Sequence, residues 1–140
     1  MVRTRRDARE RALSLCYELD VRGSSVDDLL FELPVAPAAY AVELARGVED
    51  HRDEIDAIIS KFADRWSIDR MPVIDRNLLR IAVYELGWRP DIPLAVAISE
   101  AVDLAKRYST DDSGRFVNGM LGRIGENLRD DSGGPPRTPG

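Results

Sequence analysis

The sequence has few of the residues from which metal centres and disulfide frameworks are built. Among its 140 residues, Cys16 is the only cysteine and His51 the only histidine. A disulfide framework and a thiolate metal cluster are therefore excluded. No apolar run approaches the roughly 18 residues that cross a bilayer, and the N-terminus lacks the apolar core of a signal peptide. We therefore expect a soluble protein of the cytoplasm.

The groups of an enzyme active site are scarce as well. His51 lies in EDHRDE on a predicted helix, where an exposed surface residue is a better interpretation than a general base. Carboxylates are plentiful, but no paired arrangement and no phosphate-binding glycine loop accompanies them. We therefore expect no catalytic residue, no metal site and no cofactor.

What the sequence does contain is helical periodicity. Apolar residues recur at spacings of three and four, and no alternating β-branched stretch with hairpin turns is present, which predicts an all-α fold. A length of 140 residues with 44% hydrophobic content suits one domain, over residues 1–129, in which two helical lobes pack together. Residues 130–140 read DDSGGPPRTPG and have neither periodicity nor apolar anchors, so we predict a disordered tail there.

Local signals predict where the helices begin and end. Thr4 with Asp7 resembles a capping box, and Gly23 suits the end of the helix that this box opens. Two later prolines suit the first turns of two further helices. One long helix is expected in the middle of the chain, with Gly47 as a point where it bends. The predicted helices cover residues 4–20, a short stretch after 25, then 38–66, 72–88, 93–108 and a last helix from about 113.

The start of the chain is basic although the protein is acidic. Residues 3–17 hold five arginines against two acids, while the whole chain carries a net charge of −5. An acidic protein with one basic end is suited to bind a phosphate backbone at one defined place. Arg6 and Tyr17 share a stripe of the helix that Arg9 borders, which favours RNA because arginine binds phosphate and both side chains stack on unpaired bases. A solvated helix face is the alternative interpretation.

A second segment, STDDSGRFVNGMLG over residues 109–122, adds aromatic and small residues. Phe116 lies at the edge of an apolar arc, so it suits either the core or a stacking platform, and Arg115 beside it favours RNA. Asp112 suits the first turn of a helix, where a carboxylate complements the dipole. The opposite face carries Asn118 and three glycines, each of which costs about 1 kcal/mol relative to alanine and so indicates the close approach of another backbone. These glycines are Gly119, Gly122 and Gly125.

The predicted helix over residues 72–88 carries two carboxylates, Asp75 and Glu85, on its apolar side. We favour an internal pair between Glu85 and an arginine of another helix, because burying an unpaired charge is costly. A basic partner protein that faces Glu85 is the alternative. Asp75 has the simpler interpretation of stabilising the first turn of its helix, and Arg76 and Arg80 lie on the opposite side.

Three stretches together resemble the NusB family of bacterial transcription antitermination factors. They read RRDARERALSLCYEL at 5–19, DRNLLRIAVYEL at 75–86 and DIPLAVAISEAVDLAKRYSTDDSGRFVNGMLG at 91–122, and the resemblance spans nearly the whole chain up to the tail. It implies about seven helices in two subdomains, no catalysis, and the binding of single-stranded boxA RNA in ribosomal RNA operon transcripts together with NusE, a ribosomal small-subunit protein. With other Nus factors, the complex would help RNA polymerase to resist termination and would support ribosomal RNA synthesis.

The resemblance also implies positions for the binding residues. The arginine motif of the family falls within the basic segment, and its second RNA-facing region falls near the start of the last helix, where Gly114 departs from the family pattern. RNA is therefore expected to contact Arg3, Arg5, Arg6, Arg9, Tyr17, Asp112, Arg115, Phe116 and Asn118. NusE is expected to contact Asp75, Arg76 and Arg80.

Other interpretations require features that the sequence lacks or leaves open. A helix-turn-helix DNA regulator would need a basic recognition helix in the interior of the chain, where the sequence is acidic. NusB-like domains also form the non-catalytic N-terminal part of ribosomal RNA cytosine methyltransferases. Because 140 residues are too few to include the methyltransferase domain, we favour a free-standing factor, and a free-standing relative of that RNA-binding domain is the alternative. A generic all-α interaction module stays open, as does a homodimer in the absence of NusE.

Overall fold

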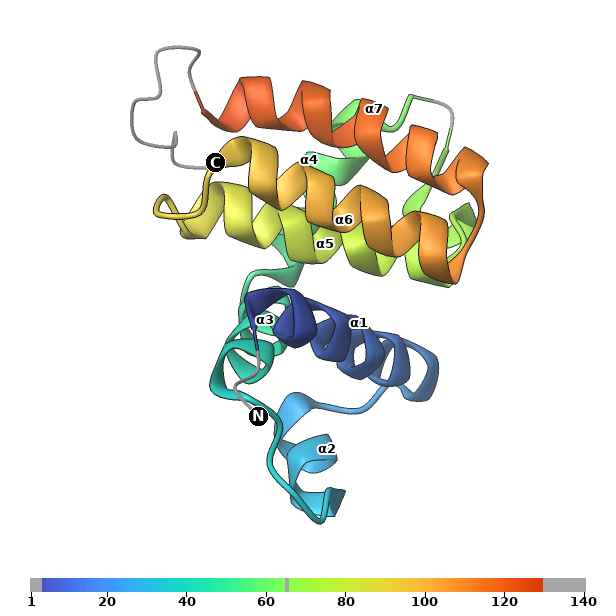
Figure 1. Ribbon diagram of the computed structural model, residues 1–140. Helices are drawn as coiled ribbons and strands as arrows, with labels where there is room; N and C mark the ends of the chain where they lie inside the picture. Colours follow the sequence, from blue (N-terminus) through green and yellow to red (C-terminus); the bar gives the residue numbers. More distant parts are fainter. Residues whose placement is uncertain (1–3, 65, 130–140) are drawn as a thin grey trace.

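The computed structural model describes residues 4–64 and 66–129, and within that range it contains helices and no strand (Figure 1). The all-α prediction and the expectation of about seven helices are confirmed. Arg3 and the predicted disordered tail, residues 130–140, lie outside the described residues. The elements are α1 (Arg5–Arg22), α2 (Val26–Glu32), α3 (Ala39–Asp50), α4 (Arg52–Phe62), a 3₁₀ helix η1 (Ile68–Arg70), α5 (Val73–Trp88), α6 (Leu94–Tyr108) and α7 (Asp111–Leu128).

The helices form two lobes, with α1, α2 and α3 in one and α4 to α7 in the other (Figure 1). α5 joins the lobes, because it packs against α1 and α3 as well as against α4, α6 and α7. Every residue from 77 to 86 is buried, including Arg80 and Glu85, and the buried apolar side chains form one continuous cluster. Polar groups of this central helix therefore depend on partners inside the protein.

None of the described helices combines the length and the apolar character that crossing a membrane requires.

Local caps set the ends of α1. The Asp7 amide donates to Thr4 Oγ1 at 3.1 Å, and the Thr4 amide donates to Asp7 Oδ2 at 3.2 Å, so the predicted capping box is confirmed. Gly23 follows the helix with φ of 69°, a left-handed conformation that glycine adopts without steric penalty. Pro72 and Pro93 are the N-cap residues of α5 and α6, directly before their first turns.

The predicted single helix over residues 38–66 is wrong. The chain forms α3 and α4, and the break lies at His51, whose φ of −113° and ψ of 21° interrupt the helix. Gly47 is not a bend, because it lies within α3, where the Tyr84 ring packs so closely that any Cβ would collide with it. His51 is half-buried rather than exposed, since its ring stacks on that of Trp88 with centroids 4.6 Å apart. Hydrophobic periodicity continues through a one-residue break and did not reveal this one.

α7 begins at Asp111, two residues before its predicted start. Thr110 caps it by accepting a hydrogen bond from the Ser113 amide at 2.9 Å. Gly114 therefore lies in the first turn, where a Cβ would be only 2.7 Å from Cγ of Lys106. Glycine at this position lets the start of α7 pack tightly against the end of α6.

The face of small residues on α7 has two different environments. A Cβ at Gly125 would lie 2.6 Å from Cδ1 of Leu94, so the close approach there is made by a side chain of α6 and not by a backbone. At Gly119 and Gly122 no other helix of the described chain comes within 4 Å of the Cβ position, so a close approach there by another protein or by nucleic acid stays a prediction. This part of α7 is open to solvent.

Candidate nucleic-acid interface

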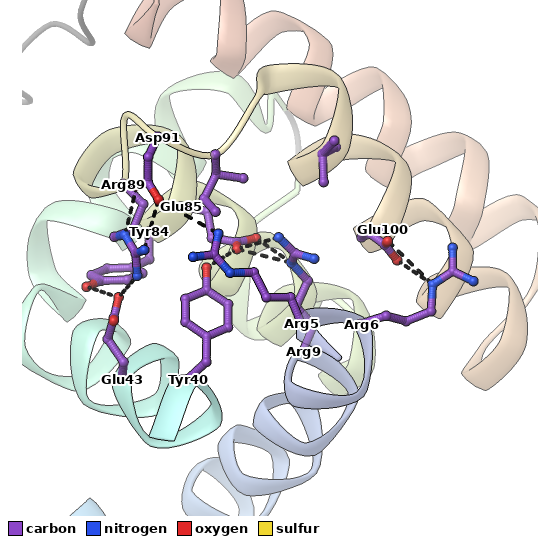
Figure 2. Close-up of polar contacts among 12 residues, drawn as sticks. Arg5, Arg6, Arg9, Tyr40, Glu43, Tyr84, Glu85, Arg89, Asp91 and Glu100 are labelled. Carbon is purple, nitrogen blue, oxygen red and sulfur yellow. Dashed lines mark hydrogen bonds and ion pairs between the residues drawn. The ribbon is translucent and has the colours of Figure 1, made fainter. Parts of the chain in front are cut away.

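The first arginines of α1 meet acids of the other lobe (Figure 2). Arg5 pairs with Asp91, in the connection between α5 and α6, at 3.7 Å. Arg6 pairs with Glu100 of α6 at 3.0 Å. The basic segment therefore lies along the boundary between the lobes, and carboxylates partly neutralise its charge.

Arg9, one turn further along α1, is inside the protein. It is 4% exposed, and its Nε donates to both oxygens of Glu85 at 3.0 and 3.1 Å. The Tyr40 hydroxyl donates to the same carboxylate, and burial together with this hydrogen bond raises the pKa of Tyr40. The internal pair that we favoured for Glu85 is confirmed. The Arg9 guanidinium, predicted to contact RNA, is directed away from the surface and binds Glu85 instead.

A groove of about 560 Å³ lies beside the exposed part of α1. Tyr17, 43% exposed, and Tyr108 at the end of α6, 45% exposed, both line it. Arg11 lines it too and donates to Ser14 Oγ at 3.3 Å, and it has no carboxylate partner among residues 4–64 and 66–129. Two exposed rings and a guanidinium beside Leu13 and Ile74 suit the stacking of unpaired bases, and the carboxylates of Asp7 and Glu10 line the same groove.

Tyr108 is a groove residue that sequence reasoning missed. Its hydroxyl donates to Glu10 of α1, and this hydrogen bond raises the pKa of Tyr108. Arg107 approaches the same carboxylate at 3.6 Å. These contacts hold the ring against the α1 side of the groove. The only signal in the sequence was an aromatic residue directly before the segment STDDSG.

A second pocket, of about 270 Å³, opens between the start of α5 and the start of α7. Trp66, 57% exposed, and Phe116, half-buried, are among the residues that line it. Asp75 also lines it and is 2% exposed, and its Oδ1 has no hydrogen-bond partner among the described residues. Burial raises the pKa of Asp75, while the hydroxyls of Ser113 and Ser109 offset part of that effect. A buried oxygen without a donor is costly, so this pocket suits a molecule that donates to it.

The other predicted RNA residues lie on the exposed side of α7. Asp112 and Arg115 form an exposed ion pair, and Asn118 is exposed. Asp112 and Phe116 both line the second pocket. Phe116 also packs against the core, so both interpretations of this ring hold in part.

Arg76 and Arg80, predicted to contact NusE, are held mainly by internal acids. Arg76 Nε lies 2.7 Å from Asp20 Oδ2, and Arg80 lies 3.2 Å from the same oxygen. Arg80 also lies 2.8 Å from Asp56 Oδ1, and its side chain is only 3% exposed. The network joins α1, α4 and α5 and leaves these guanidinium groups little surface. Of the predicted NusE residues, Asp75 lines the second pocket.

The groove and the second pocket are neighbours. Ile74 and Tyr108 line the groove, while Asp75 and Thr110, close to them in sequence, line the second pocket. Predicted residues from α1 and α7 therefore gather around the start of α5 and the turn between α6 and α7. No group of His, Cys, Asp and Glu within the described chain could hold a metal ion.

Comparisons with known proteins agree on one family. The model of the NusB family matches residues 6–126. The transcription antitermination protein NusB of Salinispora tropica is 50% identical over 129 residues, which cover 87% of this chain and 95% of that protein. The protein of that name from Thermobifida fusca is 46% identical over 129 residues, which cover 88% of this chain and 89% of that protein.

Solved structures show the same similarity. T. maritima NusB matches with a TM-score of 0.82 and 36% identity, covering 90% of this chain and 93% of that one. A structure of the antitermination factors NusB and NusE in complex with dsRNA matches with a TM-score of 0.76 and 34% identity, covering 90% of this chain and 98% of that one.

Proposed function

The chain belongs to the NusB family of transcription antitermination factors, and from that membership we propose that it binds single-stranded boxA RNA of ribosomal RNA operon transcripts together with NusE. The family consists of RNA-binding factors and not of enzymes, so the chain is not an enzyme. In the proposed role the complex joins RNA polymerase and other Nus factors in the cytoplasm. There it helps the polymerase to resist termination and supports ribosomal RNA synthesis.

The observation that carries the proposal is the groove beside α1. It places Tyr17 and Tyr108 on the surface next to Arg11, and Arg6 directly precedes the first groove residue of α1 and has a side chain that is 60% exposed. Phosphate contacts from arginine supply affinity, while the rings together with polar groups near them favour particular unstacked bases. Arg5 extends the phosphate-binding part of this surface along α1.

The two rings favour single-stranded over double-stranded RNA. In an RNA duplex the bases are stacked on each other, so a protein reaches mainly phosphates and 2′-hydroxyls. Arginines on α1 would serve either form, and one similar structure is of NusB and NusE with dsRNA. Tyr17 and Tyr108 gain a partner only when bases are unstacked. The preference for a single strand therefore depends on the groove rather than on charge.

The second pocket is the proposed contact for NusE. Asp75 offers a buried oxygen without a donor, and Asp112 adds negative charge at the exposed rim. A basic or hydroxyl side chain of the partner would satisfy that oxygen, while Trp66 and Phe116 would cover its apolar part. Because groove and pocket are neighbours, RNA and NusE would bind side by side. When NusE is absent, the same apolar rim is proposed to support a homodimer.

Fluorescence anisotropy tests the proposal directly. A labelled boxA-like single-stranded RNA and a scrambled RNA are titrated with the protein, with and without NusE, over a salt series. We expect tighter binding of the boxA-like RNA and a further gain with NusE. Equal, weak binding of both RNAs, unaltered by NusE, would contradict the proposal and leave a generic helical interaction module.

Arginine substitutions separate the binding surface from general charge. Arg6→Ala is expected to weaken RNA binding severalfold and to reduce the slope of log affinity against log salt by up to about one, because one phosphate contact is lost. Arg46→Ala is the matched control, since Arg46 pairs with Asp27 on the opposite side of its lobe and is 44% exposed. Equal slopes for the two variants would count against an RNA contact at Arg6.

A further inference from the structure

Arg6 is exposed, yet its guanidinium already holds an anion. Its Nε lies 3.0 and 3.4 Å from the two oxygens of Glu100, and Asp103 adds attraction from the next turn of α6. The Arg6 side chain is 60% exposed, whereas that of Glu100 is only 15% exposed. Figure 2 shows this pair apart from the cluster around Glu85. A carboxylate that binds arginine in this way occupies the place that a phosphate would take.

We propose that Glu100 is an internal competitor for RNA, which occupies the Nε edge of the Arg6 guanidinium in the free protein and must be displaced by a phosphate before that edge can bind RNA. The inference rests on the proposed function and adds an affinity-limiting residue to it. In this proposal Arg6 strengthens RNA binding, whereas its partner Glu100 weakens it.

The burial of Glu100 makes the competition costly for RNA. A fully exposed acid could turn away from a bound phosphate, but Glu100 is held against α1, and its negative charge stays near the phosphate that replaces it. All binding that uses Arg6 therefore loses a similar factor in affinity. RNA that gains only phosphate contacts becomes a weak ligand, while RNA that is also stacked in the groove stays bound.

Asp91 beside Arg5 is a weaker case of the same arrangement. The two groups are 3.7 Å apart, and Asp91 already accepts two hydrogen bonds of 3.0 Å from Arg89. Arg5 also lies over the Tyr40 ring, 4.9 Å from its centroid, so Asp91 is not its main contact. Glu100 has Arg6 as its principal partner among the described residues, which makes it the residue to test.

Glu100→Gln keeps the shape of the side chain and removes its charge. We expect this variant to bind the boxA-like single-stranded RNA about two- to fivefold more tightly at low salt, the range for an exposed ion pair. Its salt dependence should be steeper, because Arg6 would then exchange bound anions and not a carboxylate for phosphate. Asp103→Asn is the control, since it makes the same charge change on the same helix without a hydrogen bond to Arg6.

A double-mutant comparison completes the test. In an Arg6→Ala background, Glu100→Gln should lose its effect on RNA affinity, and thermal unfolding should show that all variants are folded. Weaker binding by Glu100→Gln would mean that Glu100 positions Arg6, and equal gains from both acid variants would mean a general charge effect. Either result overturns the inference.

The same measurements distinguish failure of this inference from failure of the proposed function. If the wild-type protein prefers boxA-like RNA and Arg6→Ala weakens RNA binding while Glu100→Gln leaves it unchanged, only this inference fails. If neither preference nor Arg6 effect is seen, the proposed function fails with it.

Discussion

The two ends of α5 each carry a buried carboxylate, and the two carboxylates differ in their hydrogen-bond partners. Near the C-terminal end, Glu85 accepts hydrogen bonds from Arg9 and Tyr40, which satisfy its charge inside the protein. Near the N-terminal end, Asp75 is equally buried and is among the residues that line a pocket, but its Oδ1 has no donor among the described residues. A buried acid with all its partners stabilises the fold, whereas the buried acid that lacks a donor beside a pocket is the one that we propose contacts another molecule.

The largest expected effect is at the Glu85 end. Arg9→Ala leaves the Glu85 charge buried without its cation, which is expected to lower the free energy of unfolding by about 3 to 5 kcal/mol. Urea unfolding measures this loss. Arg46→Ala serves as the control and should change stability little, because its ion pair is exposed. A loss at Arg9 as small as that at Arg46 would remove the distinction between the two ends of α5.

The groove beside the Asp75 end should affect RNA and not stability. Tyr108→Ala removes one stacking surface and is expected to weaken RNA binding at least about fivefold, with little change in salt dependence. Tyr108→Phe keeps the ring but loses the hydrogen bond to Glu10, so it should bind RNA nearly as well as wild type. Anisotropy titrations measure both variants. A loss of affinity in the phenylalanine variant as large as in the alanine variant would shift the role from the ring to the hydroxyl.

Asp75 itself tests whether the unsatisfied oxygen serves a partner. Asp75→Asn keeps the size of the side chain but removes its charge, and it is expected to weaken binding of NusE up to about tenfold, because a hydrogen bond to a neutral amide oxygen is weaker than one to a carboxylate. Isothermal titration calorimetry with NusE gives the affinity. Asp69→Asn, an exposed acid of η1, is the control for general charge. Unchanged affinity for NusE in Asp75→Asn would place the partner elsewhere.

The smallest expected effect is a pH dependence of stability. Because burial raises the pKa of Asp75, the unfolded chain releases this proton at lower pH than the folded protein does. The presence of Asp75 therefore lowers stability as pH rises through its unfolded-state pKa, and the full cost is present above its folded-state pKa. Asp75→Asn should be more stable than wild type at neutral pH, and this gain should vanish in acid. Urea unfolding of both proteins across that range checks the trend, and a difference independent of pH would contradict it.

Local signals in the sequence were sufficient for much of the fold. The capping box of Thr4 and Asp7 and the glycine that ends α1 were predicted because their partners lie within a few residues. Glu85 was predicted to pair with an arginine of another helix, because burying an unpaired charge is costly. Which arginine it would be depended on the packing of α1 against α5. The break at His51 was missed because the apolar pattern on both sides of it continues in phase.

The candidate site was predictable in its residue types more than in its geometry. Arg6 and Tyr17 were found from one helix face, and both lie on the surface. Arg9 and Arg80 looked exposed in helical projection and are buried, because acids more than 20 residues away in sequence meet them. Tyr108 lies across from α1 only after α6 has packed, so no local pattern could place it in the groove.

The central claim is that the surface around the start of α5 binds RNA and NusE while the Glu85 end of the helix holds the fold together. Chemical-shift changes in the ¹⁵N-labelled protein, titrated with boxA-like single-stranded RNA and then with NusE, test it in one experiment. The account predicts that RNA shifts amides near Arg6, Tyr17 and Tyr108, that NusE adds shifts near Asp75 and Asp112, and that amides around Tyr40 and Glu85 change least. Shifts concentrated around Tyr40 and Glu85, with the groove and the pocket unaffected, would contradict it.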